Sequence, residues 1–467
     1  RGIDGLADGA GIPRGALHRA VTMPETYLWV LQRALASRGA PLAPRYGVPL
    51  MGCTSALAWG QATRDGAMLH GRNFDYQGVG AWDTEQAVVF HRPDEGQPYV
   101  SVSAAGILFG GITAMNASGL TLVVHQHMAS DAFELGGTPI GITGDDVMRH
   151  AETLDDARRI LDDHTPTGCW TYVIGSAKEQ NVLCYEVTPS RRACFDADGG
   201  DLFAYSNMYL HPEVAPTERL LYPSHWRNNA ARWRRAGDLL RARRGDIDAD
   251  HVASILGDRG EEGCRFEEAI SMIMTVGSVV FRPDDGVVWV GTGRAPTSNR
   301  PYAAFDLHRE AAAADQPMLE GGVPSAHEVA GAFDAYRDSY EDYFGRGDVP
   351  AARRHMERAR RLQPSEPLYA YVAGLLALLD GDARSAERDL SAALEVGHPE
   401  PERVAAFHLW RGRARDRLGK RELAVADYRE ALSGDRYAAE AARRGLDRAY
   451  QPKRFGIEYT LADVPMP

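Results

Sequence analysis

The sequence predicts an α+β domain followed by an all-α repeat domain, and three features of the chain support this. Up to about residue 305, short strand-like runs alternate with turns and a few helical stretches. Beyond Pro324 the pattern of apolar residues becomes helical. In that second part, small residues recur with a period of 34 residues, which is typical of stacked helix pairs. A chain of 467 residues has room for both domains.

The α+β prediction depends on six runs rich in β-branched and aromatic residues. These runs are Tyr99–Ala104, Leu120–His125, Trp170–Ile174, Asn181–Val187, Gly277–Phe281 and Gly286–Val290. Two stretches, Asp145–Leu161 and Trp226–Leu240, carry apolar residues three and four positions apart, so we expect helices there. Many strands with few helices favour the α+β class.

A strand-turn-strand pattern follows the dipeptide Gly52-Cys53. The run Ser55–Gly60 is strand-like, Arg64-Asp65-Gly66 is typical of a turn, and the chain returns as a second strand that ends near Arg72. Such a hairpin brings Arg72 and Asp75 back beside Cys53.

The dipeptide Gly52-Cys53 has the composition of a self-cleaving site. A break before Cys53 would leave a thiol and a free α-amine on one residue, and the amine, with a pKa near 8, can serve as the base. Gly52 would tolerate the strained backbone that self-cleavage requires. A lone cysteine is more often a small buried hydrophobe, so the prediction depends on the residues around it.

Five segments of the chain, in this order, resemble the Ntn hydrolases of the penicillin acyltransferase type, the acyl-CoA:6-aminopenicillanic-acid acyltransferase-like peptidase family C45. The choloylglycine hydrolases are more distant relatives. The segments are Gly52-Cys53-Thr54, Gly71–Asp75, Met115–Leu120, Tyr205-Ser206-Asn207 and Thr275–Phe281, and Arg1–Gly11 also resembles the family's pro-segment. The resemblance covers about residues 1–300 and implies a four-layer αββα sandwich.

This resemblance implies that the chain cuts itself between Gly52 and Cys53, and that Cys53 becomes the nucleophile with its own α-amine as base. Arg72 would hold the sulfur anion and lower the pKa of the thiol. Asp75 would accept a hydrogen bond from the new α-ammonium group or from the Cys53 backbone and fix its orientation. The simpler interpretation of Arg72 and Asp75 is an ordinary surface ion pair.

The resemblance also implies two oxyanion donors and a second arginine. Asn207 would direct its amide at the oxyanion, although a turn residue before His211-Pro212 is the simpler interpretation. The second donor falls at Gln126, where the relatives carry asparagine. The second arginine of the choloylglycine relatives matches Arg232, with Arg227 as the competing choice and a basic helix face as the simpler interpretation.

His125 and His127 flank Gln126 and alternate along a predicted strand, so both imidazoles would face one side, as a pair of zinc ligands does. The sequence offers no third ligand and contains neither His-Glu-x-x-His nor Cys-x-x-Cys, so we expect no metal and no cofactor. These histidines are expected to line the substrate pocket or to pack in the sheet. The predicted substrate-binding residues are His125, Trp170 and Tyr209, with Trp82, Phe109 and Trp226 as further candidates.

Composition excludes some classes of binding partner but does not decide the cellular compartment of the protein. The net charge of -12 argues against binding of nucleic acid, and no apolar run reaches about 18 residues, so no membrane span is expected. The chain begins at Arg1, which is compatible with a trimmed leader, so a cytoplasmic and an exported location both stay open. If Cys53 is catalytic, the four other cysteines can form two disulfides or simply pack in the core. Cys264 matches a family cysteine and is interpreted as structural.

The repeats of the second part share a Gly-Asp pair followed by two alanines. Gly347-Asp348 with Ala352 and Ala359 recurs 34 residues later as Gly381-Asp382 with Ala386 and Ala393, and 38 residues after that as Gly419-Lys420 with Ala424 and Ala431. These three copies resemble tetratricopeptide repeats, although a plain helical bundle is the simpler interpretation. Such arrays bind a peptide or a partner protein, or mediate self-association.

The predicted domains are a pro-segment at 1–52, an Ntn-hydrolase catalytic domain at 53–305, a linker at 306–330, tetratricopeptide-like repeats at 331–450 and a tail at 451–467. The predicted function is that of an autoprocessed cysteine amidohydrolase or N-acyltransferase, acting on a linear non-peptide amide of an N-acylated small molecule through a Cys53 thioester. The sequence does not decide between hydrolysis and transfer. The alternative is a non-catalytic scaffold whose repeats recruit a peptide or protein.

Overall fold

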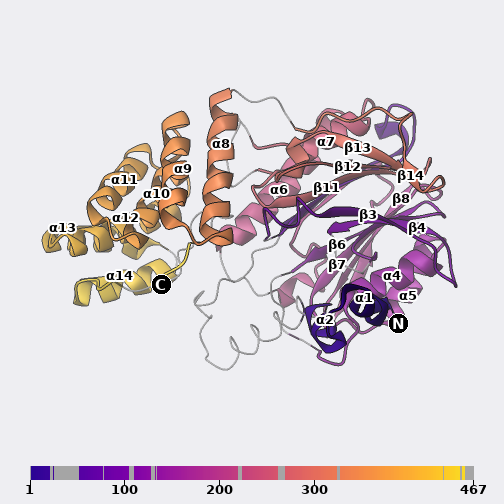
Figure 1. The fold of residues 1–467 in the computed structure, drawn as a ribbon, viewed down its shortest axis with the longest axis horizontal. Coiled ribbons are helices and arrows are strands. Elements are labelled where there is room, and N and C mark those ends of the chain that lie inside the picture. Colours follow the sequence, from indigo (N-terminus) through magenta and orange to yellow (C-terminus); the bar gives the residue numbers. More distant parts are fainter. Residues whose placement is uncertain are drawn as a thin grey trace. The chain divides into compact units, whose positions relative to one another are not determined.

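The computed structural model describes residues 2–21, 25, 52–76, 78–104, 110–127, 132, 134–218, 223–260, 269–322, 327–434, 436–452 and 455–457. The chain forms two compact units, drawn in Figure 1. The first contains the described residues up to Arg259 together with 269–322, and the second contains those from 327 onward.

The first unit contains two antiparallel seven-stranded sheets. In one sheet the strand order is β10-β1-β2-β11-β12-β13-β14. Its strands are β1 (Gly52–Ala58), β2 (Leu69–Asp75), β10 (Leu202–Tyr205), β11 (Thr275–Arg282), β12 (Val287–Gly291), β13 (Tyr302–Asp306) and β14 (Ala311–Ala312). The hairpin β1–β2 therefore lies inside the sheet, with β10 next to β1 and β11 next to β2.

The second sheet runs in chain order from β3 to β9. Its strands are β3 (Gln86–His91), β4 (Tyr99–Ala104), β5 (Thr113–Asn116), β6 (Leu120–Gln126), β7 (Trp170–Ser176), β8 (Asn181–Val187) and β9 (Arg192–Phe195). Two of the predicted runs, Tyr99–Ala104 and Asn181–Val187, coincide with strands, and the other four differ by one or two residues at an end.

The two sheets face each other and helices cover their outer faces, which gives the predicted four-layer αββα sandwich (Figure 1). Helices α6 (Pro223–Ala242) and α7 (Ala249–Leu256) pack on the first sheet, and α4 (Ile140–His150) and α5 (Leu154–Asp163) pack on the second. A separate apolar layer lies between the sheets and includes Leu57 of β1 and Val123 of β6. Both faces of the central strands of each sheet are thus buried.

The remaining helical elements of this unit are short. They are α1 (Gly2–Ala10), α2 (Arg14–Val21) and the 3-10 turns Gly60–Ala62, Ala215–Thr217 and Thr297–Asn299. The single helix predicted at Asp145–Leu161 is wrong, because the chain forms α4 and α5 there. Thr153 caps α5 in a reciprocal pair with Asp156, and this capping box starts a new helix.

The region predicted as a linker, 306–330, differs from that expectation at both ends. Strand β14 pairs with β13, and Leu319 forms an antiparallel bridge with Tyr302, so the chain still belongs to the first unit there. The first helix of the second unit already begins at His327.

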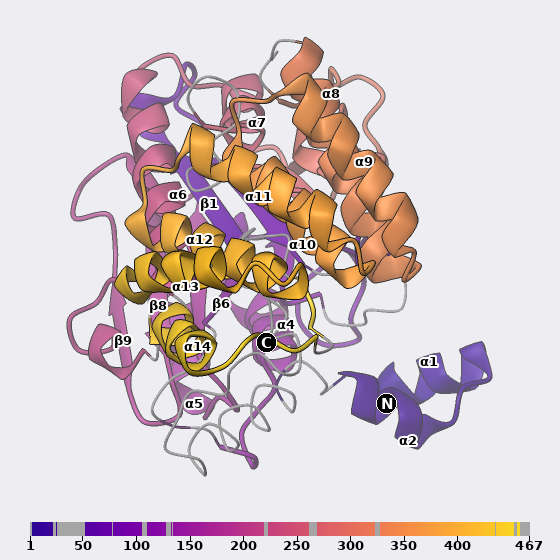
Figure 2. The same cartoon turned by 90° about the vertical axis from the view of Figure 1, so that its left-hand side faces the viewer.

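The second unit is helical, as predicted, and consists of successive helix pairs (Figure 2). Its elements are α8 (His327–Tyr340), a π-turn (Glu341–Gly345), α9 (Val349–Leu362), α10 (Pro367–Leu379), α11 (Ala383–Val396), α12 (Pro401–Arg417), α13 (Arg421–Glu430), a 3-10 turn (Ala431–Ser433) and α14 (Arg436–Asp447). Among the described residues, no helix is long and apolar enough to cross a membrane.

The repeated Gly-Asp pair explains how these helices are joined. Gly347 and Gly381 adopt positive φ angles of 67° and 84°, a conformation that glycine takes without strain. The next residue, Asp348 or Asp382, caps the following helix by accepting from a backbone N–H of its first turn. The alanines of the repeat are fully buried, so the paired helices can approach closely.

Candidate active site

Strand pairing places the candidate nucleophile at the end of the β1–β2 hairpin. Gly52 lies opposite Asp75, Cys53 opposite Phe74 and Ser55 opposite Arg72. Ala56 and Ala58 face α6 and α7, whereas Leu57 faces the second sheet. Because side chains alternate along a strand, Cys53 and Ser55 also face the second sheet. Cys53 is 3% exposed.

Arg72 connects Cys53 to the second sheet. Its guanidinium donates to Cys53 Sγ over 3.5 Å and to the carbonyl oxygen of Val124 on β6 over 3.1 Å, and it also donates to Thr113 Oγ1. The ring of Phe74 lies 4.7 Å from the guanidinium carbon. The cation is fully enclosed, so its charge acts on Cys53 with little screening by water.

The effect of Arg72 on the pKa of the Cys53 thiol has the predicted direction, but it does not decide the net shift in this structure, in which Gly52 and Cys53 belong to one strand. Burial raises the pKa of the Cys53 thiol, and the nearby Arg72 opposes that rise without cancelling it. Asp75 adds to the rise through its negative charge. Cys53 is therefore a thiol here, and a base must remove its proton before it can attack.

Asn207 holds the backbone nitrogen of Cys53. The Cys53 N–H donates to Asn207 Oδ1 over 2.6 Å, and Asn207 Nδ2 donates to the carbonyl oxygen of Gln126 over 2.8 Å. Asn229 Nδ2 fixes the backbone of Asn207 by donating to its carbonyl oxygen over 2.6 Å. One hydrogen of the Asn207 amide nitrogen is thus already engaged.

Arg232 of α6 holds the carbonyl of Cys53. Its guanidinium donates to Cys53 O over 2.7 Å and to Asn207 Oδ1 over 3.2 Å. Asn228 and Asn229 accept from the same guanidinium over 2.9 and 2.6 Å. Of the two arginines considered in the sequence, Arg232 is therefore the one that the structure places on Cys53.

Asp75 presents a carboxylate oxygen beside Gly52. Thr275 Oγ1 donates to Asp75 Oδ1 over 2.5 Å, whereas Oδ2 is buried and has no hydrogen-bond partner in the described part of the chain. A Cβ atom built on Gly52 would lie 2.9 Å from this Oδ2. Burial raises the pKa of Asp75 to about 6, against the opposing effects of Arg232, Thr275 and Arg72.

The raised pKa of Asp75 predicts a pH-dependent stability for the uncut chain. Between its ordinary pKa of 3.8 and about 6, the folded chain binds more protons than the unfolded chain, so the free energy of unfolding falls as pH rises through this range. In a Cys53→Ala background, Asp75→Asn should remove this fall. In urea unfolding, the free energy of unfolding of the variant relative to its parent should be higher at pH 7 than at pH 4 by on the order of 3 kcal/mol. A difference that does not change with pH would contradict the assignment.

Gln126 contributes its backbone to the site, and its side chain lies elsewhere. Leu122 and Val124 pack under α4 and α5, and Gln126 shares their face of β6. Its side-chain amide therefore points to the face of the sheet that lies away from Cys53. The predicted role of this amide as oxyanion donor therefore does not fit the strand. The Gln126 Nε2 atom is buried with no hydrogen-bond partner among the described residues.

The backbone N–H of Gln126 is a donor that the sequence did not suggest. The N–H of His127 donates to the carbonyl oxygen of Cys169, the residue just before β7, so the N–H of Gln126 points to the opposite edge of β6. On that edge Val124 O binds Arg72, and Gln126 O binds Asn207. No described residue accepts from the Gln126 N–H, which leaves a backbone donor between the two anchors of Cys53.

The comparison with protein families was decisive. A family model described as acyl-coenzyme A:6-aminopenicillanic acid acyl-transferase matches residues 62–295. The chain belongs to this acyl-transferase family. Family membership implies acyltransferase or amidohydrolase activity of the Ntn type in general.

An uncharacterized protein of Archaeoglobus fulgidus is 29% identical to this acyl-transferase family member over 187 aligned positions, and the match covers 35% of this chain and 31% of that protein. The chain thus spans about a third of the length of this curated relative.

Solved structures similar to this chain are helical repeat domains. The N-terminal domain of stress-induced protein-1 from C. elegans has 19% identity and a TM-score of 0.24, and covers 27% of this chain and 100% of that chain. The TPR domain of Arabidopsis OM64 has 21% identity and a TM-score of 0.23, and covers 26% of this chain and 97% of that chain.

The three predicted substrate-binding residues of this acyl-transferase family member lie in the protein core. His125 is fully buried between the sheets. Trp170 packs in the apolar cluster under α4 and α5. Tyr209 stacks on His127 at 3.6 Å between ring centres and donates to Val187 O. None of them borders the cavity at Arg72.

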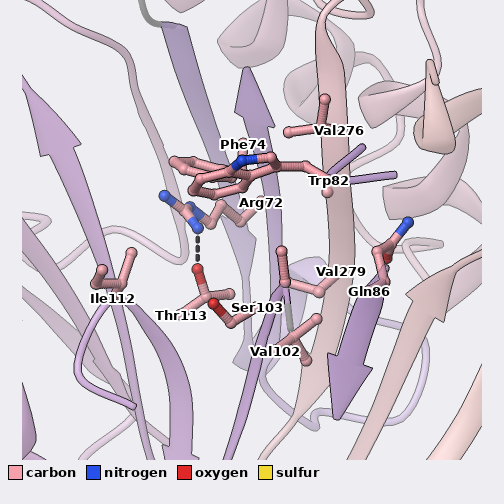
Figure 3. A pocket seen from close by; sticks show the side chains of 12 residues that line it. Arg72, Phe74, Trp82, Gln86, Val102, Ser103, Ile112, Thr113, Val276 and Val279 are labelled. Carbon is pink, nitrogen blue, oxygen red and sulfur yellow. Dashed lines mark hydrogen bonds between the residues drawn. The ribbon is translucent and has the colours of Figure 1, made fainter. Parts of the chain in front are cut away.

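A narrow cavity begins at Arg72 and holds about 490 Å³ of empty space, part of it open to solvent. Phe74 and Trp82 lie over the arginine, with ring centres 5.4 Å apart (Figure 3). Trp82 thus lines a pocket, as expected. The other walls are mostly apolar and are formed by Gln86, Val102, Ser103, Ala104, Ile112, Thr113, Val276, Gly277 and Val279. Such walls suit the apolar part of a small molecule.

The described residues contain no cluster of three or more side chains suited to a metal ion. Within the same residues, the cysteines at 53, 184 and 194 are free thiols. Cys264, predicted to be structural, and Phe109, a candidate pocket residue, lie outside the described residues.

Proposed function

We propose that this chain is an autoprocessed cysteine amidohydrolase or N-acyltransferase that acts on the linear non-peptide amide of an N-acylated small molecule. One observation carries the proposal. Three buried side chains hold three different atoms of Cys53, with Arg72 on the sulfur, Asn207 on the nitrogen and Arg232 on the carbonyl oxygen. A cysteine that only packs in a core does not require this arrangement.

Maturation begins with attack of Cys53 Sγ on the carbonyl carbon of Gly52. The carbon–sulfur bond forms as the carbon–nitrogen bond breaks, and the former amide nitrogen takes up a proton. Water then hydrolyses the resulting thioester, which leaves a carboxylate on Gly52 and an amine on Cys53. The Oδ2 atom of Asp75 lies beside Gly52 and has no partner among the described residues, which supports a role as acceptor for the ammonium group that forms.

In the mature enzyme the free α-amine of Cys53 takes the thiol proton, and the sulfur attacks the substrate carbonyl. The second hydrogen of Asn207 Nδ2 and the backbone N–H of Gln126 are the donors we assign to the oxyanion. The α-ammonium then protonates the leaving amine, and a thioester remains on Cys53. Water resolves this thioester in hydrolysis, and a second amine resolves it in acyl transfer.

The domain roles follow from this proposal. Residues 1–52 would be the pro-segment, the sandwich would carry catalysis, and the tetratricopeptide-like repeats at 331–450 would bind a peptide or protein partner or mediate self-association. The alternative of a non-catalytic scaffold is not favoured, because such a protein has no need for the contacts that converge on Cys53.

The proposed thioester can be trapped directly. The purified protein is mixed with a panel of N-acylated amines, quenched in acid and digested, and the peptide that contains Cys53 is weighed by mass spectrometry. We expect release of the free amine together with an acyl adduct on Cys53. Amine release with an adduct on another residue, or none on Cys53 at any time point, would contradict the proposal.

Gly52 should control the rate of maturation. A Cβ atom at this position would lie 2.6 Å from Met272 Cε and 2.9 Å from Asp75 Oδ2, so Gly52→Ala forces the neighbours of the scissile bond apart. Self-cleavage should slow by about 10-fold or more, because a small displacement of reacting groups lowers the rate sharply. A time course on a denaturing gel measures this rate. Gly9→Ala, where a Cβ atom meets nothing within 4 Å, is the control and should mature at the normal rate.

A further inference from the structure

A buried polar pair crosses the apolar layer between the two sheets. Ser55 Oγ and His125 Nε2 lie 2.8 Å apart, and both residues have no exposed surface. Leu57 and Val123 of the apolar layer lie beside the pair along the two strands, and His70 Nε2 lies 3.5 Å from the same Ser55 Oγ. Two apolar residues would pack here without loss of hydration, so a buried polar pair needs a reason other than stability.

The second imidazole nitrogen of His125 adds to the free-energy cost of burying this pair. His125 Nδ1 is buried and has no hydrogen-bond partner in the described part of the chain. Burial, together with the charge of Arg72, holds the pKa of His125 well below its ordinary value, so the ring is neutral. A neutral ring with one satisfied nitrogen contributes a single directed hydrogen bond, and that bond joins one sheet to the other.

The position of the pair relative to Cys53 gives it a role. Ser55 is two residues after Cys53 on β1 and faces the same way. His125 lies on β6 between Val124, whose carbonyl anchors Arg72, and Gln126, whose carbonyl anchors Asn207. The bond between Ser55 and His125 therefore connects the strand of the nucleophile to the strand segment that holds both of its partners.

We propose that His125 is a positioning residue, which through Ser55 sets the distance between Cys53 and the β6 segment that carries the Gln126 N–H. The inference rests on the proposed function and deepens it, because the oxyanion donor and the nucleophile belong to different sheets. The bonds of Arg72 and Asn207 to β6 and the bond between His70 and Thr121 also join the two sheets, and the Ser55–His125 bond adds a direct link between the strand of the nucleophile and β6. Loss of this link lets the donor and the sulfur shift relative to each other. Misplacement by about 1 Å is enough to lower a rate by about 100-fold.

The test compares three variants in the mature enzyme. His125→Phe keeps the ring size and removes the bond, and kcat should fall by about 10- to 100-fold, while KM for the N-acyl amide changes by less than about 3-fold. His125→Gln restores a polar group near the position of Nε2 and should recover kcat to within about 5-fold. His127→Phe makes the same change one side chain further along the same face of β6 and should leave kcat nearly unchanged, because His127 bonds to Thr171 and Glu218 and not to β1.

A double-mutant cycle completes the test. Ser55→Ala should lower kcat about as much as His125→Phe, and the two changes together should lower it no further, because they remove one shared bond. Normal kcat in folded His125→Phe, no recovery in His125→Gln, or full additivity with Ser55→Ala would each overturn the inference. An inactive wild-type protein would instead contradict the proposed function, so the two failures are distinguishable.

Discussion

The Cys53→Ala variant should remain a single chain and lose amidase turnover by at least about 10³-fold. The substitution removes the sulfur that Arg72 contacts and leaves the backbone contacts of Asn207 and Arg232 in place, so the fold should persist. Loss of a catalytic nucleophile removes both the covalent route and the benefit of the groups that act with it. Intact mass and release of free amine from an N-acyl substrate measure the two effects.

A matched control exists on β9. Cys194 is a free, exposed thiol on the edge strand of the second sheet, so Cys194→Ala removes a cysteine without touching the site. This variant should be cut and should turn over substrate as the wild type does. A Cys53→Ala protein that still cleaves itself at Gly52 would place the nucleophile elsewhere in the chain.

The second large effect is expected from Arg232→Met. The change leaves Cys53 O without its buried donor, removes one of the two donors to Asn207 Oδ1 and takes a positive charge away from the surroundings of Asp75. Removal of one partner from a buried charged network typically costs about 3–5 kcal/mol. We expect self-cleavage to stop, and the free energy of unfolding in urea to fall by about that amount.

Arg227→Met is the control for this prediction, because the sequence alone leaves Arg227 and Arg232 as competing choices on the same helix. It should process normally and lose less than about 1 kcal/mol of stability. Arg232→Lys separates the two contributions, since it keeps the charge and loses the fork that reaches Cys53 and Asn207 together. Equal effects of Arg227→Met and Arg232→Met would contradict the assignment of Arg232 to Cys53.

The hairpin and the repeats could be predicted from the sequence because their signals are local. The turn at Arg64-Asp65-Gly66 returns β2 along β1, and this pairing alone brings Arg72 to Cys53. The repeated Gly-Asp pair specifies where one helix ends and the next is capped. Neither prediction needs knowledge of distant contacts.

Residues far apart in the sequence were reached only through the family resemblance. Asn207 and Arg232 lie more than 150 positions from Cys53, and no local pattern relates them to it. The error at Gln126 has a physical cause. In an αββα sandwich both faces of β6 are buried, so the pattern of apolar residues does not reveal which face looks toward the nucleophile.

Two further properties depended on the folded environment. The pKa of the Cys53 thiol is set by the balance between burial and the charge of Arg72, and burial prevails in the uncut chain. Trp170 and Tyr209 were expected to line a pocket because they are aromatic, but aromatic side chains also fill cores. Their true positions follow from the packing of α4 and of the segment after β10.

The most direct test of the account is the intact mass of the purified wild-type protein together with N-terminal sequencing of its largest chain. The account predicts two chains, residues 1–52 and a larger one that begins at Cys53. A protein that stays whole after prolonged incubation under native conditions, or a larger chain that begins at any other residue, would contradict it.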